Sequence, residues 1–226
     1  EELPDHLLII GGGYIGMEFS QMFRRFGAKV TVVQFNDRIM PQEDADVSSE
    51  IQRFLEAEGV EILCNTAAKA VTQDKDGRIT LTTERNGKPE TLTGSHLLIA
   101  AGRKPNSDHL NLAAAGIEPT SRGHIPVDDC CQTSVEGVFA IGDVNGNGAF
   151  THTSVHDSEV VLDYLFGGPR RVSARNPIHG LFTDPPLGRV GLTEKEALDQ
   201  GIRLLKGTKS MKTINRAKEM SETNGF

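Results

Sequence analysis

Six residues, GGGYIG at positions 11–16, connect an apolar run to a helical pattern. The apolar run, Leu7–Ile10, has the length of a short strand. Behind the glycines, apolar residues return at helical spacing, at Ile15, Phe19, Met22, Phe23 and Phe26. The glycines therefore form a strand-to-helix turn. The next run, KVTVVQF at 29–35, is rich in β-branched residues and predicts a buried parallel strand, which completes a β-α-β unit.

The pattern continues as a doubly wound α/β domain. A helix is expected over about 45–58, with Asp44 as its N-cap, followed by a strand at VEIL (60–63). From 70 to 92 the hydrophobic period changes to two around Asp-Gly and Asn-Gly turns, which predicts a small antiparallel meander in place of a helical crossover. HLLIA at 96–100 predicts another buried strand.

The later part of the chain is less regular. Two short strands are expected at HIPV (124–127) and GVFAIGD (137–143), followed by a helix from about Thr153 to Phe166. We also expect exposed apolar surface around Val138–Ile141 and on the helix after Thr153. RRVSARNP (170–177) reads as a linker to a third unit.

The glycine turn has the pattern G-x-G-x-x-G in the setting that dinucleotide sites require, between a strand and a helix. Gly11 permits the tight turn, Gly13 lets the backbone approach a pyrophosphate, and Gly16 lets helix and strand pack closely. The free N–H groups at the helix start, around Tyr14 and Ile15, and the helix dipole favour phosphate. The turn therefore predicts a nicotinamide dinucleotide site.

The residue type at the end of the second strand leaves the choice of dinucleotide open. A site for NAD usually has Asp or Glu there, on the ribose 2′-hydroxyl. This chain has Gln34, which can hydrogen-bond a hydroxyl and does not repel a phosphate, and Arg38 is close enough in sequence to bind a 2′-phosphate. We expect NAD or NADP.

Composition excludes several classes of protein. The 226 residues have a net charge of −7, which argues against a nucleic-acid surface, and no apolar run is long enough to span a bilayer. Three cysteines without framework spacing favour a reducing compartment, so we expect a cytoplasmic protein. The sequence starts at Glu1 with a strand almost at once, so we expect a piece of a longer protein.

Four blocks occur in the order and at about the spacing of a known family: GGGYIGMEF (11–19), AAGRKPN (100–106), TSVEGVFAIGD (133–143) and FTDPPLGRVGLTEKEA (182–197). On these blocks the chain resembles the pyridine nucleotide-disulfide oxidoreductases, which include dihydrolipoamide dehydrogenase, glutathione reductase and mercuric reductase. NRAKEMSETNGF (215–226), taken with FTDPPLG, resembles the mercuric-reductase-like branch. The resemblance implies that a nicotinamide reduces FAD, which passes electrons to a redox-active disulfide and then to substrate.

The resemblance also implies an α/β architecture in three parts. Residues 1–104 would be a Rossmann-type NAD(P)-binding domain with a β-meander crossover, 105–172 the C-terminal part of an FAD-binding domain, and 173–226 the beginning of an α+β dimerisation domain. The family's own FAD fingerprint with its C-x-x-x-x-C disulfide, and its C-terminal His-Glu pair, have no counterpart in these residues. We expect the full-length protein to be a homodimer.

The resemblance assigns roles to single residues. Gly11, Gly13 and Gly16 would hold the NAD(P) pyrophosphate, and Glu18 would lie near the nicotinamide at the flavin face, as the catalytic candidate. The resemblance places four further residues as follows: Gly102 and Arg103 in the return loop over the nicotinamide nucleotide, and Gly142 and Asp143 at the flavin, with the Asp143 carboxylate accepting hydrogen bonds from the ribityl chain. Backbone N–H groups near His152 would point at the flavin pyrimidine.

Other interpretations of the polar residues are weaker. Cys130 and Cys131 could form a soft-metal dithiol, but buried unpaired cysteines mostly act as small apolar residues, as we also expect for Cys64. His152, His156 and Asp157 have no third ligand at a recognisable spacing, and Ser154 has no nucleophile elbow, so we expect no metal site and no hydrolase.

Two functions stay open at this point. The chain is either part of an FAD-dependent NAD(P)H oxidoreductase or, taken alone, an NAD(P)-binding module without turnover. A stand-alone short dehydrogenase would need its own catalytic acid and substrate pocket, and the sequence offers neither. The residues do not identify the electron acceptor.

Overall fold

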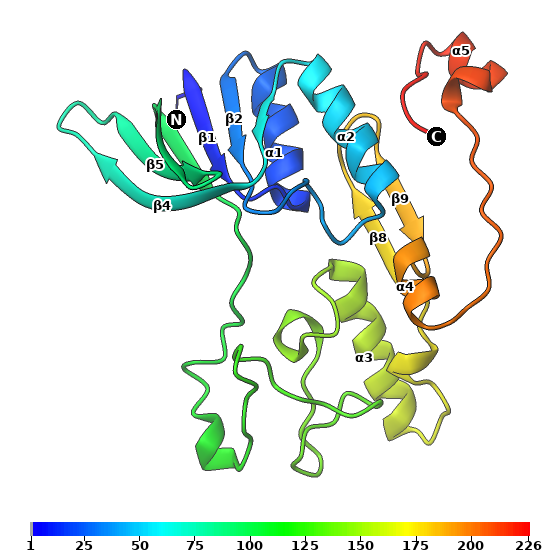
Figure 1. Cartoon of the computed structure of the whole chain (residues 1–226). Helices are drawn as coiled ribbons and strands as arrows, with labels where there is room; N and C mark the ends of the chain where they lie inside the picture. The colour runs from blue at the N-terminus through cyan, green and yellow to red at the C-terminus, as the bar shows by residue number, and fades with distance from the viewer. Residues whose placement is uncertain (1) are drawn as a thin grey trace. The chain divides into compact units, whose positions relative to one another are not determined.

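The computed structural model describes residues 2–226 and divides into two compact units (Figure 1). The first unit holds the chain up to Gly102 together with Gly180–Phe226, and the second holds Arg103–His179. The first unit is therefore built from two separate stretches of sequence.

A four-stranded parallel sheet forms the centre of the first unit. Its elements follow in the order β1 (His6–Ile10), α1 (Tyr14–Arg25), β2 (Lys29–Val33), α2 (Ala45–Ala57), β3 (Glu61–Leu63) and, later, β7 (His96–Ile99). The strand order is β3-β2-β1-β7, with all three pairs parallel. The predicted doubly wound arrangement is confirmed, with helix and strand bounds within about two residues of those expected.

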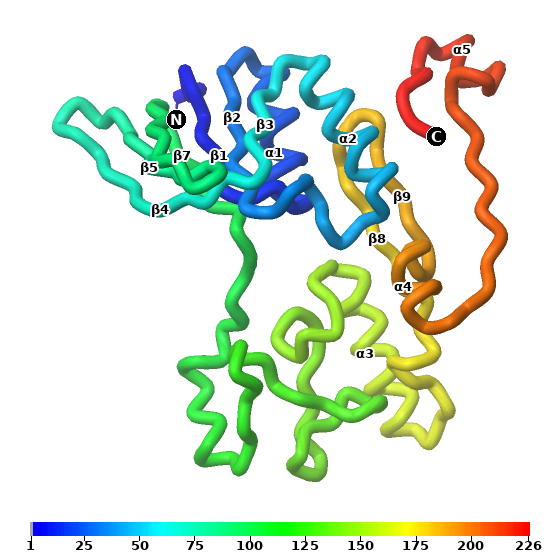
Figure 2. The backbone as a smooth tube through the Cα atoms, viewed as in Figure 1, coloured from blue at the N-terminus to red at the C-terminus, as the bar shows by residue number. Residues whose placement is uncertain are grey.

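The predicted meander is also confirmed. Strands β4 (Thr66–Gln73), β5 (Ile79–Arg85) and β6 (Lys88–Gly94) form a separate antiparallel sheet in the order β4-β5-β6, visible beside β1 in the backbone trace (Figure 2). Asn86 and Gly87, both with positive φ, make the turn between β5 and β6. This conformation is the one that two-residue hairpins require.

The two central strands of the parallel sheet, β1 and β2, are buried on both faces because most of their residues are apolar. Alternate side chains of a strand point to opposite faces. Leu7 and Ile9 of β1 join a core cluster with α1 and α2, while Leu8 joins a second cluster with Leu81 of the meander. The helices thus cover one face of the sheet and the meander covers the other.

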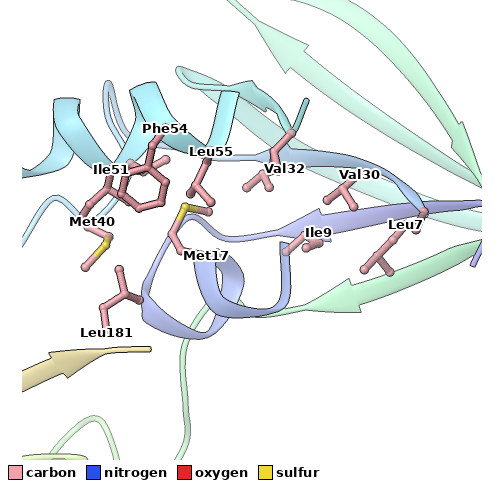
Figure 3. Close-up of a cluster of buried hydrophobic side chains, with 13 residues drawn as sticks. Leu7, Ile9, Met17, Val30, Val32, Met40, Ile51, Phe54, Leu55 and Leu181 are labelled. Atoms are coloured by element: carbon pink, nitrogen blue, oxygen red, sulfur yellow. The ribbon is translucent and has the colours of Figure 1, made fainter. Parts of the chain in front are cut away.

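The last part of the chain also contributes to this core. It forms β8 (Ile178–Leu181), β9 (Leu187–Val190), α4 (Glu194–Asp199) and α5 (Asn215–Glu219). Leu181, fully buried, lies among Met17, Met40 and the side chains of α2 (Figure 3). The parallel sheet and its helices therefore share one hydrophobic core with the C-terminal segment.

The second unit contains one long helix, α3 (Thr151–Leu165), and short 3-10 turns, among them Gly142–Asn145. The prediction of strands at 124–127 and 137–143 was wrong. These segments find no neighbouring ladder among the described residues, and their pairing is a single bridge between Gln132 and Phe139 and one bond from Ile125 N–H to the Val144 carbonyl, 2.9 Å. Their apolar residues instead form a small cluster of Ile117, Ile125 and Ala140.

Within residues 2–226, the helices are too short or too polar to cross a bilayer.

Candidate functional site

The glycine turn is packed against backbone atoms at Gly11 and Gly16 and has free space at Gly13. A Cβ atom on Gly16 would lie 2.0 Å from the Gly11 carbonyl oxygen, and one on Gly11 would lie 2.4 Å from the Ala100 carbonyl oxygen. Gly11 also has a φ of +110°, which favours glycine. At Gly13 a Cβ atom would meet nothing within 4 Å. The turn therefore packs tightly against its own protein and leaves free space only at Gly13.

That free space lies at the start of α1. Gly13 is the N-cap residue in extended conformation, and Tyr14 and Ile15 are the first two helical residues. No side chain caps the helix, so its first N–H groups are available to an anion. These features fit a pyrophosphate, and they come from the three glycines that the sequence singled out.

Gln34 lies inside the protein and bonds to the turn. Its Oε1 accepts from the Gly12 N–H at 2.9 Å, and its Nε2 donates to the Arg38 carbonyl oxygen at 3.0 Å. The side chain is almost fully buried. In the structure Gln34 therefore supports the glycine turn through its bond to Gly12. The contact with the ribose that the sequence suggests stays a prediction.

Arg38 lies at the surface of the same loop. Its Nη2 donates to the Pro41 carbonyl oxygen at 3.3 Å, and its Nη1 is 4.0 Å from the Asp37 carboxylate. The buried Arg38 Nε has no hydrogen-bond partner among the described residues. The Arg38 side chain is 34% exposed, and the accessible part of its guanidinium suits an anionic group such as a ribose phosphate.

Glu18 lies in the second turn of α1, because the helix begins at Tyr14. The helix dipole, which acts mainly on the first turn, therefore contributes little to the stability of its carboxylate. Its Oε1 accepts from the Phe182 N–H at 2.9 Å. Phe182 itself is largely exposed, so this contact ties Glu18 to an exposed part of the C-terminal segment.

A buried cluster that the sequence did not reveal lies next to the turn. The Tyr14 hydroxyl donates to Glu43 Oε1, and Arg189 Nε donates to Glu43 Oε2 at 2.9 Å. The Glu43 side chain is 1% exposed. Because Glu43 lies 29 residues from Tyr14 and 146 from Arg189, no local spacing in the sequence announces the cluster.

In the second unit, Asp143 and Arg103 form an ion pair at 2.7 Å. Both line an open hollow of about 440 Å³ together with Lys104, Asn106 and His124. Cationic and amide donors around one carboxylate suit a ligand that carries both hydroxyl and phosphate groups. The donor set is thus compatible with part of a flavin nucleotide.

Asp157 holds the loop that carries Asp143. Its carboxylate is fully buried and accepts from the Gly142 N–H and from Asn145 Nδ2, both at 2.9 Å, and from Arg175 Nη1 at 2.7 Å. These hydrogen bonds make Asp157 a buried acid that holds the loop together. The sequence gives no sign of this role, because Gly142 and Arg175 lie 15 and 18 residues away in the chain.

Two predicted positions remain, Gly102 in the first unit and His152 in the second. Gly102 has a φ of +127° and follows β7 after two residues, Ala100 and Ala101. His152 is the second residue of α3, stacks on Phe150, and its Nε2 lies 3.0 Å from the Ile178 carbonyl oxygen. The predicted roles of Gly102 at the nicotinamide nucleotide and of His152 at the flavin stay predictions.

The cysteines are buried or half-buried thiols. Cys130 and Cys131 are buried and unpaired, and Cys64 is half-buried. Burial, with the nearby Asp157 charge, raises the pKa of Cys131 to about 11, and burial raises the pKa of Cys64. Residues 2–226 contain no group of three or more His, Cys, Asp or Glu arranged to hold a metal ion.

Cys131 is therefore expected to resist alkylation in the folded chain, because the thiolate is the nucleophile and burial disfavours it. Iodoacetamide at pH 8 followed by peptide mass spectrometry should find Cys131 unmodified in the native chain and modified in denaturant, with Cys64 labelled ahead of it. Equal labelling rates of Cys131 in the native and denatured chains would contradict this expectation.

Comparisons with known proteins agree with the geometry. A family model described as pyridine nucleotide-disulphide oxidoreductase matches residues 1–158, and the dimerisation domain of the same family matches residues 179–226. Among curated proteins, dihydrolipoyl dehydrogenase of Geobacillus stearothermophilus is 35% identical and a mercuric reductase of Lysinibacillus sphaericus 31% identical, each over 100% of this chain. The chain spans 48% and 41% of their lengths.

Solved structures give the same result. The HOCl-induced flavoprotein disulfide reductase RclA from Escherichia coli, solved as a Cu(II) complex, has a TM-score of 0.89 and 37% identity over 99% of this chain and 50% of its own. LpdA from Mycobacterium tuberculosis has a TM-score of 0.90 and 27% identity over 100% of this chain and 48% of its own. The chain thus spans about half the length of each relative.

Proposed function

Because the chain belongs to the pyridine nucleotide-disulphide oxidoreductase family, we propose that it is the NAD(P)-binding portion, with part of the FAD-binding portion, of a flavin-dependent oxidoreductase. The full-length protein would pass electrons from NAD(P)H through FAD to a disulfide or a metal ion. The observation that carries the proposal is the turn at Gly11–Gly16, closed at Gly11 and Gly16 and open at Gly13, at the uncapped start of α1. This is the arrangement that a pyrophosphate requires.

The residues of the first unit, together with Arg103 at the start of the second, would bind and orient the nucleotide. The N–H groups of Tyr14 and Ile15 would receive the pyrophosphate over Gly13, and Gln34 or Arg38 would meet the ribose end. Glu18, on the same helix, would lie near the nicotinamide, and Gly102 and Arg103 would line the loop that covers it. When bound, the nicotinamide supplies a hydride and the flavin accepts it.

The second unit would supply part of the flavin site. Asp143 and Gly142 would hold the ribityl chain, and the N–H groups near His152 would face the pyrimidine. Most of the apolar side chains expected to be exposed here are exposed, among them Val138, Ile141, Val155, Leu162 and Phe166, whereas Ala140 is buried. An apolar face of this kind supports packing against the remainder of a flavin-binding domain.

The organisation of the whole protein belongs to the same proposal. Residues 1–104 would form the nucleotide domain, 105–172 the flavin portion, and 173–226 the beginning of the dimerisation domain, consistent with the family match over 179–226. We propose a cytoplasmic homodimer. The alternative is that these 226 residues alone bind NAD(P) without turnover, which supplies the direct test.

Purified chain is expected to bind NADH or NADPH and to contain no flavin. Enhancement or quenching of nicotinamide fluorescence during titration measures the first, and the visible absorption spectrum measures the second. If the chain bound neither NADH nor NADPH, the proposed nucleotide site would be refuted. A flavin absorption band that survives gel filtration would show instead that these residues suffice for FAD.

A further inference from the structure

The loop between β2 and α2 (residues 34–44) holds the glycine turn in place. The Met40 N–H donates to the Gly12 carbonyl oxygen at 2.8 Å, and the Gly12 N–H donates to Gln34 Oε1 at 2.9 Å. The Tyr14 hydroxyl, at the first residue of α1, donates to Glu43 Oε1. The loop thus fixes both sides of the turn that the proposed function assigns to NAD(P)H.

The same loop is fixed to the C-terminal segment. Arg189 of β9 donates to both Glu43 oxygens, from Nε at 2.9 Å and from Nη2 at 3.3 Å. The Asp44 carboxylate accepts from the Glu194 N–H at 2.8 Å and from the Lys195 N–H at 3.3 Å, at the start of α4. Asp44 occupies the N-cap position of α2 as predicted, but its side chain makes no bond to α2. It caps α4 instead.

Glu43 depends on Arg189 because it is buried. With the Glu43 side chain 1% exposed and Arg189 15% exposed, water cannot replace the guanidinium as partner of the carboxylate. Without Arg189, the buried Glu43 carboxylate would lose its cation and would have to move, which alters the acceptor of the Tyr14 hydroxyl. Burial, aided by the bond to Glu43, raises the pKa of Tyr14 above its usual range, so the hydroxyl remains a donor.

We propose that Glu43 and Arg189 are positioning residues for the nucleotide. Their ion pair fixes the Tyr14 hydroxyl and the first turn of α1, so that the C-terminal segment sets the affinity of the glycine turn for NAD(P)H. The inference rests on the proposed function, that this turn binds the nucleotide. Neither Glu43 nor Arg189 need touch the nucleotide for the effect.

A double-mutant cycle on the whole 226-residue chain tests the proposal. NADH or NADPH, whichever binds the unaltered chain, is titrated into Arg189→Met, Tyr14→Phe and the double variant. Each single variant is expected to raise the dissociation constant about tenfold, because a hydrogen bond to a charged group is lost, and the double variant no further than either single one. Arg216→Met, an exposed arginine of the same segment, is the control and should bind as the unaltered chain does.

Two further variants separate positioning from a general loss of stability. Arg189→Lys keeps one cation and should recover most of the affinity. If Arg189→Met does not fold, Glu43→Gln/Arg189→Met removes both charges and should fold while still binding about tenfold more weakly. The inference would be overturned if the increases in the dissociation constant of the two single variants multiplied in the double variant, or if Arg189→Met bound the nucleotide as tightly as the unaltered chain. An unaltered chain that binds neither nucleotide would refute the proposed function instead.

Discussion

Gly16→Ala is expected to abolish nucleotide binding because it disrupts the fold around the turn. The added methyl group would lie 2.0 Å from the Gly11 carbonyl oxygen, and that atom belongs to backbone that cannot rotate away. Helix α1 would have to move off β1, where Ile9 and Met17 pack in the main core. We expect a loss of more than about 4 kcal/mol in the free energy of unfolding, which belongs to the exceptional range for one substitution. Urea denaturation, monitored by circular dichroism, measures this loss in the free energy of unfolding.

Gly13→Ala is the matched control for this prediction. Its methyl group would meet no protein atom within 4 Å, and the backbone there is extended with a negative φ. The fold should survive with a change of about 1 kcal/mol or less, the usual cost of alanine at an N-cap. NADH or NADPH should nevertheless bind at least about tenfold more weakly, since the methyl group occupies the space into which the pyrophosphate must come. If Gly13→Ala and Gly16→Ala lost the same amount of stability, the conclusion that Gly16 serves packing and Gly13 leaves space for the ligand would be refuted.

Arg175→Met is expected to destabilise the second unit strongly. Arg175 pairs with Asp157, whose side chain is fully buried, and the substitution leaves that carboxylate without its cation. Breaking a buried pair from one side typically costs about 3 to 5 kcal/mol. The Gly142 N–H and Asn145 depend on the same carboxylate, so the loop of Asp143 should loosen as well. Hydrogen exchange by mass spectrometry over residues 140–147 reports this loosening.

Arg170→Met serves as the comparison within the same unit. Arg170 pairs with Glu159, and both side chains are about half exposed, so the pair contributes at most about 1 kcal/mol. Its melting curve and exchange pattern should therefore stay close to those of the unaltered chain. Equal effects of the two arginine substitutions would show that burial of Asp157 does not govern the stability of this unit.

The sequence predicts the first unit well because its information there is local. β-Branched runs, helical spacing and paired turn residues such as Asn86-Gly87 act over a few residues, and they identify the parallel sheet, both main helices and the meander. The second unit is predicted less well. GVFAIGD has the composition of a strand, but a strand needs a neighbour, and among the described residues Phe139 pairs only with Gln132.

The candidate site shows the same division. Gly11, Gly13 and Gly16 could be identified from spacing, since each meets a backbone requirement within six residues. Glu43, Arg189 and Asp157 could not, because their importance comes from burial beside residues far away in the chain. A charged residue in a sequence does not reveal whether it will be buried, and burial is what makes these three consequential.

The division of the first unit between two stretches of sequence has a consequence for folding during synthesis. Glu43 leaves the ribosome 146 residues before Arg189, and Leu181 of the shared core also comes late. At ordinary elongation rates of about 5 to 20 residues per second, the nascent nucleotide fold would wait roughly 7 to 30 s with a carboxylate that has no cation and a gap in its core. During that interval the incomplete fold is a candidate for chaperone binding and for protease attack. Its exposed core is covered only when β8 and β9 have been synthesised.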